Sequence, residues 1–124
     1  MLPFHVKFTA GESVSEQVVY AVKKALVAGS LKPGDRFPSV RALSQELRIN
    51  PNTAHKIVAA LTVDGILEVQ PGIGTVVNHA PAATAAQSSE LLEKDLEKLV
   101  VEARNLRLTL ADVTEALRRH WKTL

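Results

Sequence analysis

The sequence has no cysteine, which excludes disulfide bonds, zinc sites built on thiolates and cysteine nucleophiles. None of its apolar runs approaches the roughly 20 residues that a membrane-spanning helix needs. The first ten residues lack the charged start and the long apolar stretch of a secretory signal peptide. We therefore expect a cytoplasmic protein that has no membrane partner.

The residue groups on which most enzymes depend are also missing. We find no paired carboxylates, no Ser/His/Asp set, no phosphate-binding loop and no metal-binding cluster. The histidines are scattered, and His55 has no second ligand at helical spacing. We expect no catalytic activity, no cofactor and no metal.

Neither sign of charge is in large excess: the positive and negative residues nearly cancel, and the formal net charge is only +2. Residues 1–78 hold eight Lys or Arg and six Asp or Glu, whereas residues 79–124 hold seven of each kind. The whole excess therefore lies in the first part of the chain. A nucleic-acid-binding protein this close to neutrality must gather its cations on one face.

A change of composition divides the 124 residues into two parts. Residues 79–88 are mostly small and include one Pro, which is typical of a linker, although residues 83–86 can begin a helix. We predict a first domain at residues 1–78, a linker at 79–83 and a second region at 84–124.

The first domain begins with a helix that has clear start and stop residues. Ser13 and Glu16 have the spacing of a capping box, and Gly29 stops the helix. One face is apolar, and we expect it to enter the core. The residues on that face are Val14, Val18, Ala21, Val22 and Ala25.

Two shorter helices follow, joined by a tight turn. Ser39 caps the first of them and turns Leu43 and Leu47 inward. Asn50 caps the second, and Pro51 occupies its first position. The inward residues of this second helix are Ala54, Ile57, Val58 and Leu61, while Asn52, His55, Lys56 and Ala59 face elsewhere.

A hairpin closes the first domain. Residues 66–70 and 75–78 are expected strands around a turn at 71–74, and residues 36–37 can add a short strand. Two helices joined by a tight turn and followed by a hairpin make a winged helix-turn-helix, whose usual task is to read DNA. The expected fold class is mainly α with a small β-wing, followed by a two-helix dimerisation region.

The second region has apolar residues at a heptad-like spacing, which is interrupted at Leu108. Thr109 and Asp112 can cap a last helix. About 40 residues make a poor core alone, so these helices either close on each other in one chain or pair with a second chain. We favour a homodimer anchored by Trp121. The residues assigned to dimerisation are Leu92, Leu96, Leu99, Leu106, Leu110, Val113, Leu117 and Trp121.

Two motifs in the first domain point to a family. The chain reads Pro33-Gly34-Asp35-Arg36-Phe37-Pro38-Ser39-Val40-Arg41, and later Gly72-Ile73-Gly74-Thr75. Over about residues 12–78 it resembles the GntR family of bacterial transcription regulators, in which a Pro-Gly turn, Leu-Pro-Ser-x-Arg, a helix-turn-helix and a Gly-x-Gly-Thr wing follow one another. The quartet Asn50-Pro51-Asn52-Thr53 and the short second region are similar to the YtrA-like branch, which has a small two-helix C-terminal part.

The resemblance implies that Arg41 reaches DNA, where a guanidinium can grip a phosphate or the edge of guanine. The amide of Asn52 can pair with adenine, and Lys56 can contact a phosphate. Each assignment has a plain alternative: Arg41 as a solvated side chain, Asn50 as a helix cap only and Gly72 as an ordinary turn residue. The residues assigned to DNA binding are Ser39, Arg41, Asn50, Asn52, Thr53, His55, Lys56 and Gly72.

The expected function is a sequence-specific DNA-binding transcription regulator that binds a near-palindromic, double-stranded operator as a homodimer. That it represses follows from the family resemblance alone. The alternative is a winged-helix module that binds another protein without touching DNA. The second region is too small to enclose a metabolite in the manner of a ligand-binding domain, so the sequence leaves open whether a small-molecule effector exists.

Overall fold

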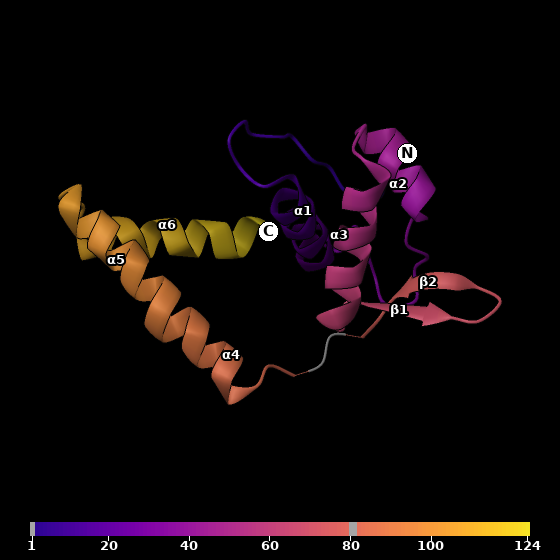
Figure 1. Cartoon of the computed structure of the whole chain (residues 1–124). Helices are drawn as coiled ribbons and strands as arrows, with labels where there is room; N and C mark the ends of the chain where they lie inside the picture. The colour runs from indigo at the N-terminus through magenta and orange to yellow at the C-terminus, as the bar shows by residue number, and fades with distance from the viewer. Residues whose placement is uncertain (1, 80–81) are drawn as a thin grey trace. The chain divides into compact units, whose positions relative to one another are not determined.

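The computed structural model describes residues 2–79 and 82–124, and the chain forms two compact units. The winged unit ends at Pro81 and the helical unit begins at Ala82 (Figure 1). Residues 80 and 81 of the expected linker lie outside the described residues. Within the described ranges, no helix is both long enough and apolar enough to span a membrane.

The first helix, α1, covers Val14–Ala28, as the sequence predicts. The hydroxyl oxygen of Ser13 accepts a hydrogen bond from the Glu16 backbone N–H at 3.3 Å, and Gly29 ends the helix in the left-handed conformation with φ of 82°. Val18, Ala21, Val22 and Ala25 are buried. The prediction for Val14 was wrong, because at the first position of the helix it lies 37% exposed.

The helix-turn-helix consists of α2, Val40–Leu47, and α3, Pro51–Val63. Arg48 ends α2 in the left-handed conformation with φ of 55°. The turn is fixed by the hydroxyl of Ser44, which donates a 2.8 Å hydrogen bond to the carbonyl of Ile49. Leu43 is fully buried, while Leu47 is only half-buried against the core.

The wing is the antiparallel pair β1, Leu67–Gln70, and β2, Gly74–Val77. Leu67 pairs with Val77, and Gln70 pairs with Gly74, which leaves three residues for the loop. The short strand expected at residues 36–37 is a single bridge between Arg36 and Val76. This bridge ties the base of the wing to the segment that leads into α2.

The core of the winged unit gathers side chains from all three helices and both strands. Val18 and Val22 of α1, Leu43 of α2 and Ile57 and Leu61 of α3 are all 0% exposed. Apolar contact of this kind is the main source of stability in a small domain. The winged unit therefore has a core of its own.

The N-terminal segment also joins this core, which the sequence analysis missed. Phe4 is 8% exposed, and its ring stacks on that of Phe37 with centroids 5.9 Å apart. Leu2 and Val6 pack against the same core. Because no helical or strand periodicity marks residues 2–12, only the structure could place them.

The helical unit contains one long helix with a π-helical middle and one regular helix. The first runs without a break through α4, Ala85–Ser89, the π-helical η1, Glu90–Asp95, and α5, Leu96–Asn105. The second is α6, Leu110–Thr123. The expected cap at Thr109 is confirmed as a capping box with Asp112, whereas the π-helical segment was not expected.

The long helix of residues 85–105 and α6 form two arms, which meet at the turn before Thr109 and diverge from it (Figure 1). Ala103 is the one buried hydrophobic residue among those described in this unit. A small cavity of about 330 Å³ lies at the junction, lined by residues that include Val100, Leu108 and Val113. Most of the apolar side chains on both arms are therefore left in solvent.

Candidate nucleic-acid interface

The start of α3 presents a polar surface beside an apolar inner face. Ala54, Ile57 and Leu61 are buried, so the residues between them turn outward. Asn52, His55 and Lys56 are exposed, and Thr53 is half-buried. Four candidate side chains therefore follow one another on two turns of one helix, where they can reach the same partner.

A shallow groove of about 410 Å³ lies between α2 and α3. Arg41 lines it from α2, and Pro51 and His55 line it from α3. The structure thus brings Arg41 and His55 together from two helices. Asn52, Thr53 and Lys56 do not line this groove but continue the surface along α3.

Ser39 and Asn50 each cap a helix. The hydroxyl oxygen of Ser39 accepts a 3.1 Å hydrogen bond from the Ala42 backbone N–H. The side-chain oxygen of Asn50 accepts a 2.8 Å hydrogen bond from the Asn52 backbone N–H. Capping uses only the acceptor of each group, so the hydroxyl proton of Ser39 and the amide protons of Asn50 can still be donated.

Gly72 lies on a different element, in the loop of the wing. The Ile73 backbone N–H donates a 3.0 Å hydrogen bond to the Gln70 carbonyl, and Gly72 has φ of 79°. With Pro71 before it, this is a type II turn, which requires a positive φ at its third residue. The loop forms the far end of the wing (Figure 1), so Gly72 can contact DNA only at a place apart from the α2–α3 groove.

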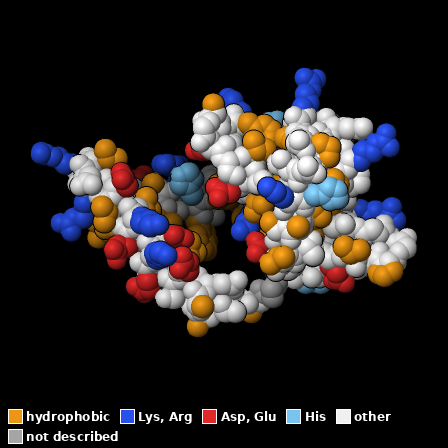
Figure 2. Space-filling model, viewed as in Figure 1, with side chains coloured by type: hydrophobic (Ala, Val, Ile, Leu, Met, Phe, Trp, Pro, Cys, Tyr) orange, Lys and Arg blue, Asp and Glu red, His pale blue; other side chains and the backbone are white. Residues whose placement is uncertain are grey.

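Unpaired cations border these elements. Within the part of the chain that the structure describes, Arg36, Arg41 and Lys56 form no ion pair. Figure 2 shows Lys and Arg side chains projecting from the edge of the winged unit that carries α2 and the wing. An unpaired surface cation is available to neutralise a phosphate.

Arg36 was not among the predicted DNA-binding residues. Its backbone pairs with Val76 of β2, which places this exposed side chain beside the wing. The pairing joins residues 40 positions apart in the sequence, so only the fold reveals it. Ile73, which is half exposed at the end of the wing, was likewise not among the predicted DNA-binding residues.

The residues assigned to dimerisation lie on the helical unit. All except the half-buried Val113 are exposed, and Leu110 and Trp121 reach 82%. No group of three His, Asp or Glu that could hold a metal occurs among the residues described. The polar entry of α3, the groove beside it and the glycine-tipped wing together define a winged helix-turn-helix of the DNA-binding type.

Comparison with known proteins gives the family. The sequence profile of the bacterial regulatory proteins of the gntR family matches residues 14–77. The chain belongs to the GntR family of transcription regulators. Its relatives are regulators and not enzymes.

One relative agrees with this assignment in sequence, and solved structures share the fold. The HTH-type transcriptional repressor YtrA of Bacillus subtilis is 32% identical over 91 residues, which cover 73% of this chain and 70% of YtrA. The crystal structure of a transcriptional antiterminator from Listeria monocytogenes matches with a TM-score of 0.84 at 19% identity, over 94% of this chain and 88% of that one. AraR(DBD), solved in complex with operator ORX1, matches with a TM-score of 0.50 at 24% identity, over 59% of this chain and 94% of AraR(DBD).

Proposed function

We propose that the protein represses transcription by binding a near-palindromic operator as a homodimer. The observation that carries this proposal is the entry of α3, where exposed polar side chains stand beside the unpaired Arg41 and Lys56. The name of the relative YtrA as a transcriptional repressor supports the direction of regulation. The operator complex of AraR(DBD) supports double-stranded DNA as the partner.

Base recognition is assigned to α3. An amide side chain can donate a hydrogen bond to N7 of adenine and accept one from its N6 amino group. Asn52 therefore reads an A·T pair when α3 enters the major groove. Thr53 can touch the methyl group of thymine. His55 lies across the groove from Arg41, and either side chain can reach a base edge or a phosphate.

Backbone contacts are assigned to the residues around α3. Lys56 and Arg41 neutralise phosphates, and the N-termini of α2 and α3, capped by Ser39 and Asn50, can hold further phosphates. Gly72 lets the wing backbone approach the duplex closely because it has no side chain. These contacts orient the protein but specify little sequence.

Dimerisation is assigned to the helical unit. Its arms expose Leu96, Leu99 and Trp121, and a second copy with the same apolar face can cover them. A two-fold dimer carries two α3 helices, which fit successive major grooves of a palindromic site.

A pair of substitutions tests the DNA surface. Asn52→Ala is expected to cost about 1–3 kcal/mol on the preferred operator and to relax selectivity at particular positions. Lys56→Ala is expected to weaken binding to all sequences alike and to lower the salt slope by about one unit. Lys98→Ala, an exposed lysine of the helical unit, is the control and should change neither.

The measurement is fluorescence anisotropy on a randomised set of duplexes at several salt concentrations. Uniform losses for both variants would contradict the base-reading role of Asn52. Arg41→Glu gives the harsher test, because it reverses a charge at the groove. Arg41 is exposed, so the substitution should change the stability of the fold little. A stable Arg41→Glu protein with unchanged operator affinity would refute the proposed surface and favour a protein-binding module.

A further inference from the structure

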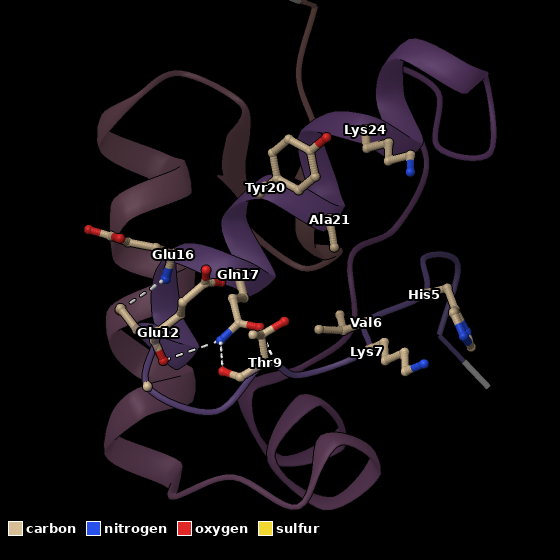
Figure 3. A pocket seen from close by; sticks show the side chains of 12 residues that line it. His5, Val6, Lys7, Thr9, Glu12, Glu16, Gln17, Tyr20, Ala21 and Lys24 are labelled. Carbon is tan, nitrogen blue, oxygen red and sulfur yellow. Dashed lines mark hydrogen bonds between the residues drawn. The ribbon is translucent and has the colours of Figure 1, made fainter. Parts of the chain in front are cut away.

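A pocket of about 840 Å³ lies between the N-terminal segment and the outer side of α1 (Figure 3). Residues 5–13 form one wall, and residues 16–24 of α1 form the other. None of the residues proposed to touch DNA lines it. The function proposed above therefore leaves this pocket unexplained.

Both ends of the N-terminal segment are held in place. At one end, Phe4 stacks on Phe37. At the other, Gln17 accepts a 2.7 Å hydrogen bond from the Thr9 backbone N–H and donates 3.2 Å bonds to the carbonyls of Thr9 and Glu12. Because the segment is fixed on both sides, the pocket has a defined shape before anything enters it.

The charges of the pocket are separated. Glu12 and Glu16 lie on one side of the view, and Lys7 and Lys24 lie on the other (Figure 3). Within the described ranges, the structure records no ion pair for any of these four side chains. Two unpaired anions thus border the pocket on one side and two unpaired cations on the other.

An apolar middle separates the charged ends. The ring of Tyr20 stands between Glu16 and Lys24, four residues from each, so the three lie on one face of α1. Ala21 and Val6 add apolar surface beside the ring. Eight residues of helix separate the outer two positions by about 12 Å.

We propose that this pocket binds a short zwitterion with an apolar or aromatic middle, of the length of a tripeptide. An extended tripeptide spans about 10 Å. Its ammonium group would lie toward Glu12 and Glu16, and its carboxylate toward Lys7 and Lys24. The side chain of its central residue would pack on Tyr20.

Occupation of the pocket has a consequence for α2, and this second step rests on the proposed DNA-binding function. The segment that forms one wall also carries Phe4, whose partner Phe37 stands two residues before the cap of α2 at Ser39. A ligand that binds only this arrangement of the segment therefore stabilises the stacked position of Phe37 over any other position. We expect it to change operator affinity.

The binding step can be tested without DNA. Tyr20 is the only tyrosine, so protein made with 3-fluorotyrosine gives one fluorine resonance, and it reports on the pocket. The probes are alanyl-phenylalanyl-alanine and the same peptide with its N-terminus acetylated, its C-terminus amidated, or both, which removes one or both charges. We expect saturable shifts from the free peptide, with at least fivefold weaker binding of the doubly blocked form.

Substitutions then locate the charges. Lys24→Gln is expected to weaken binding of the unblocked peptide two- to fivefold, which is the range for an exposed ion pair. It should leave the amidated peptide unchanged, because that peptide has no carboxylate. Lys23→Gln is the matched control, since Lys23 neighbours Lys24 on α1 but does not line the pocket.

Two outcomes would overturn the proposed site: no saturable shift with the free peptide, or equal affinity for all four peptides. The operator measurement is separate. If the peptide shifts the fluorine resonance but not operator affinity, the site stands and its link to α2 is wrong. If the protein binds no operator at all, the fluorine titration still decides the site.

Discussion

The winged unit and the helical unit have similar fractions of apolar residues but use them in opposite ways. In the winged unit, Val18, Val22, Leu43, Ile57 and Leu61 are completely buried. In the helical unit, Ala103 is the one described hydrophobic residue that is buried. Leucines, valines and one tryptophan along its arms stay in solvent.

This difference separates folding from assembly. We expect the winged unit to fold by itself, because large apolar side chains from three helices meet there. The helical unit forms its turns through local caps at Thr84 and Thr109, yet these contribute little compared with a core. Its exposed apolar face is the kind of surface that marks a protein interface.

The largest expected effect concerns the winged core. Leu61→Ala should lower the free energy of unfolding of the winged unit by about 2–5 kcal/mol, because it leaves a cavity among fully buried neighbours. Urea unfolding followed by circular dichroism measures this loss. Val63→Ala on the same helix is the control, since Val63 is 86% exposed and its truncation should change stability by less than about 0.5 kcal/mol.

The next effect concerns the helical unit. If the helical unit forms the proposed dimer, Leu99→Glu should weaken dimerisation at least roughly a hundredfold, because a carboxylate would be buried in the proposed interface without a partner. The winged unit should keep its unfolding transition. Sedimentation equilibrium gives the dissociation constant, and Val63→Glu adds the same charge outside the helical unit as the control. Unchanged dimerisation of Leu99→Glu would remove this residue from the interface.

A smaller effect is expected at the cap of α6. The hydroxyl oxygen of Thr109 accepts a 3.1 Å hydrogen bond from the Asp112 backbone N–H. Thr109→Ala should therefore lower the stability of the helical unit by about 1 kcal/mol. Thr109→Ser, which keeps the hydroxyl, should restore most of that loss in a thermal melt followed by circular dichroism.

The smallest effect is a pH dependence at the same cap. The hydrogen bond from the Thr109 backbone N–H to the Asp112 carboxylate lowers the pKa of Asp112 from its usual value of 3.8. A lowered folded-state pKa gives stability that is present above the usual value and is lost as pH falls through the lowered one. The stability difference between the protein and Asp112→Asn should therefore shrink below about pH 4. A difference that stayed constant down to pH 2 would contradict this role.

Local signals in the sequence were sufficient to predict most of the fold. Ser13, Ser39, Asn50 and Thr109 each cap the helix expected of them, because a cap depends on residues no more than three apart. Long-range contacts were not predicted. The stacking of Phe4 on Phe37 joins segments that no local pattern connects.

The candidate site divides in the same way. Positions on one helix, such as Asn52 and Lys56, could be placed on its outer face from helical periodicity. The groove that joins Arg41 to His55, and the approach of Arg36 to the wing, depend on how elements pack. The π-helical turns of Glu90–Asp95 also went unpredicted, because the heptad-like leucine spacing there favours a regular α-helix.

Sedimentation velocity on two chains tests most directly whether the helical unit assembles the protein. One is the intact chain, and the other ends at Asn78 and keeps every buried residue of the winged core. We predict that the intact chain sediments as a dimer at micromolar concentration, while the shortened chain is folded and sediments as a monomer. A monomeric intact chain, or a shortened chain that still sediments as a dimer, would contradict the account.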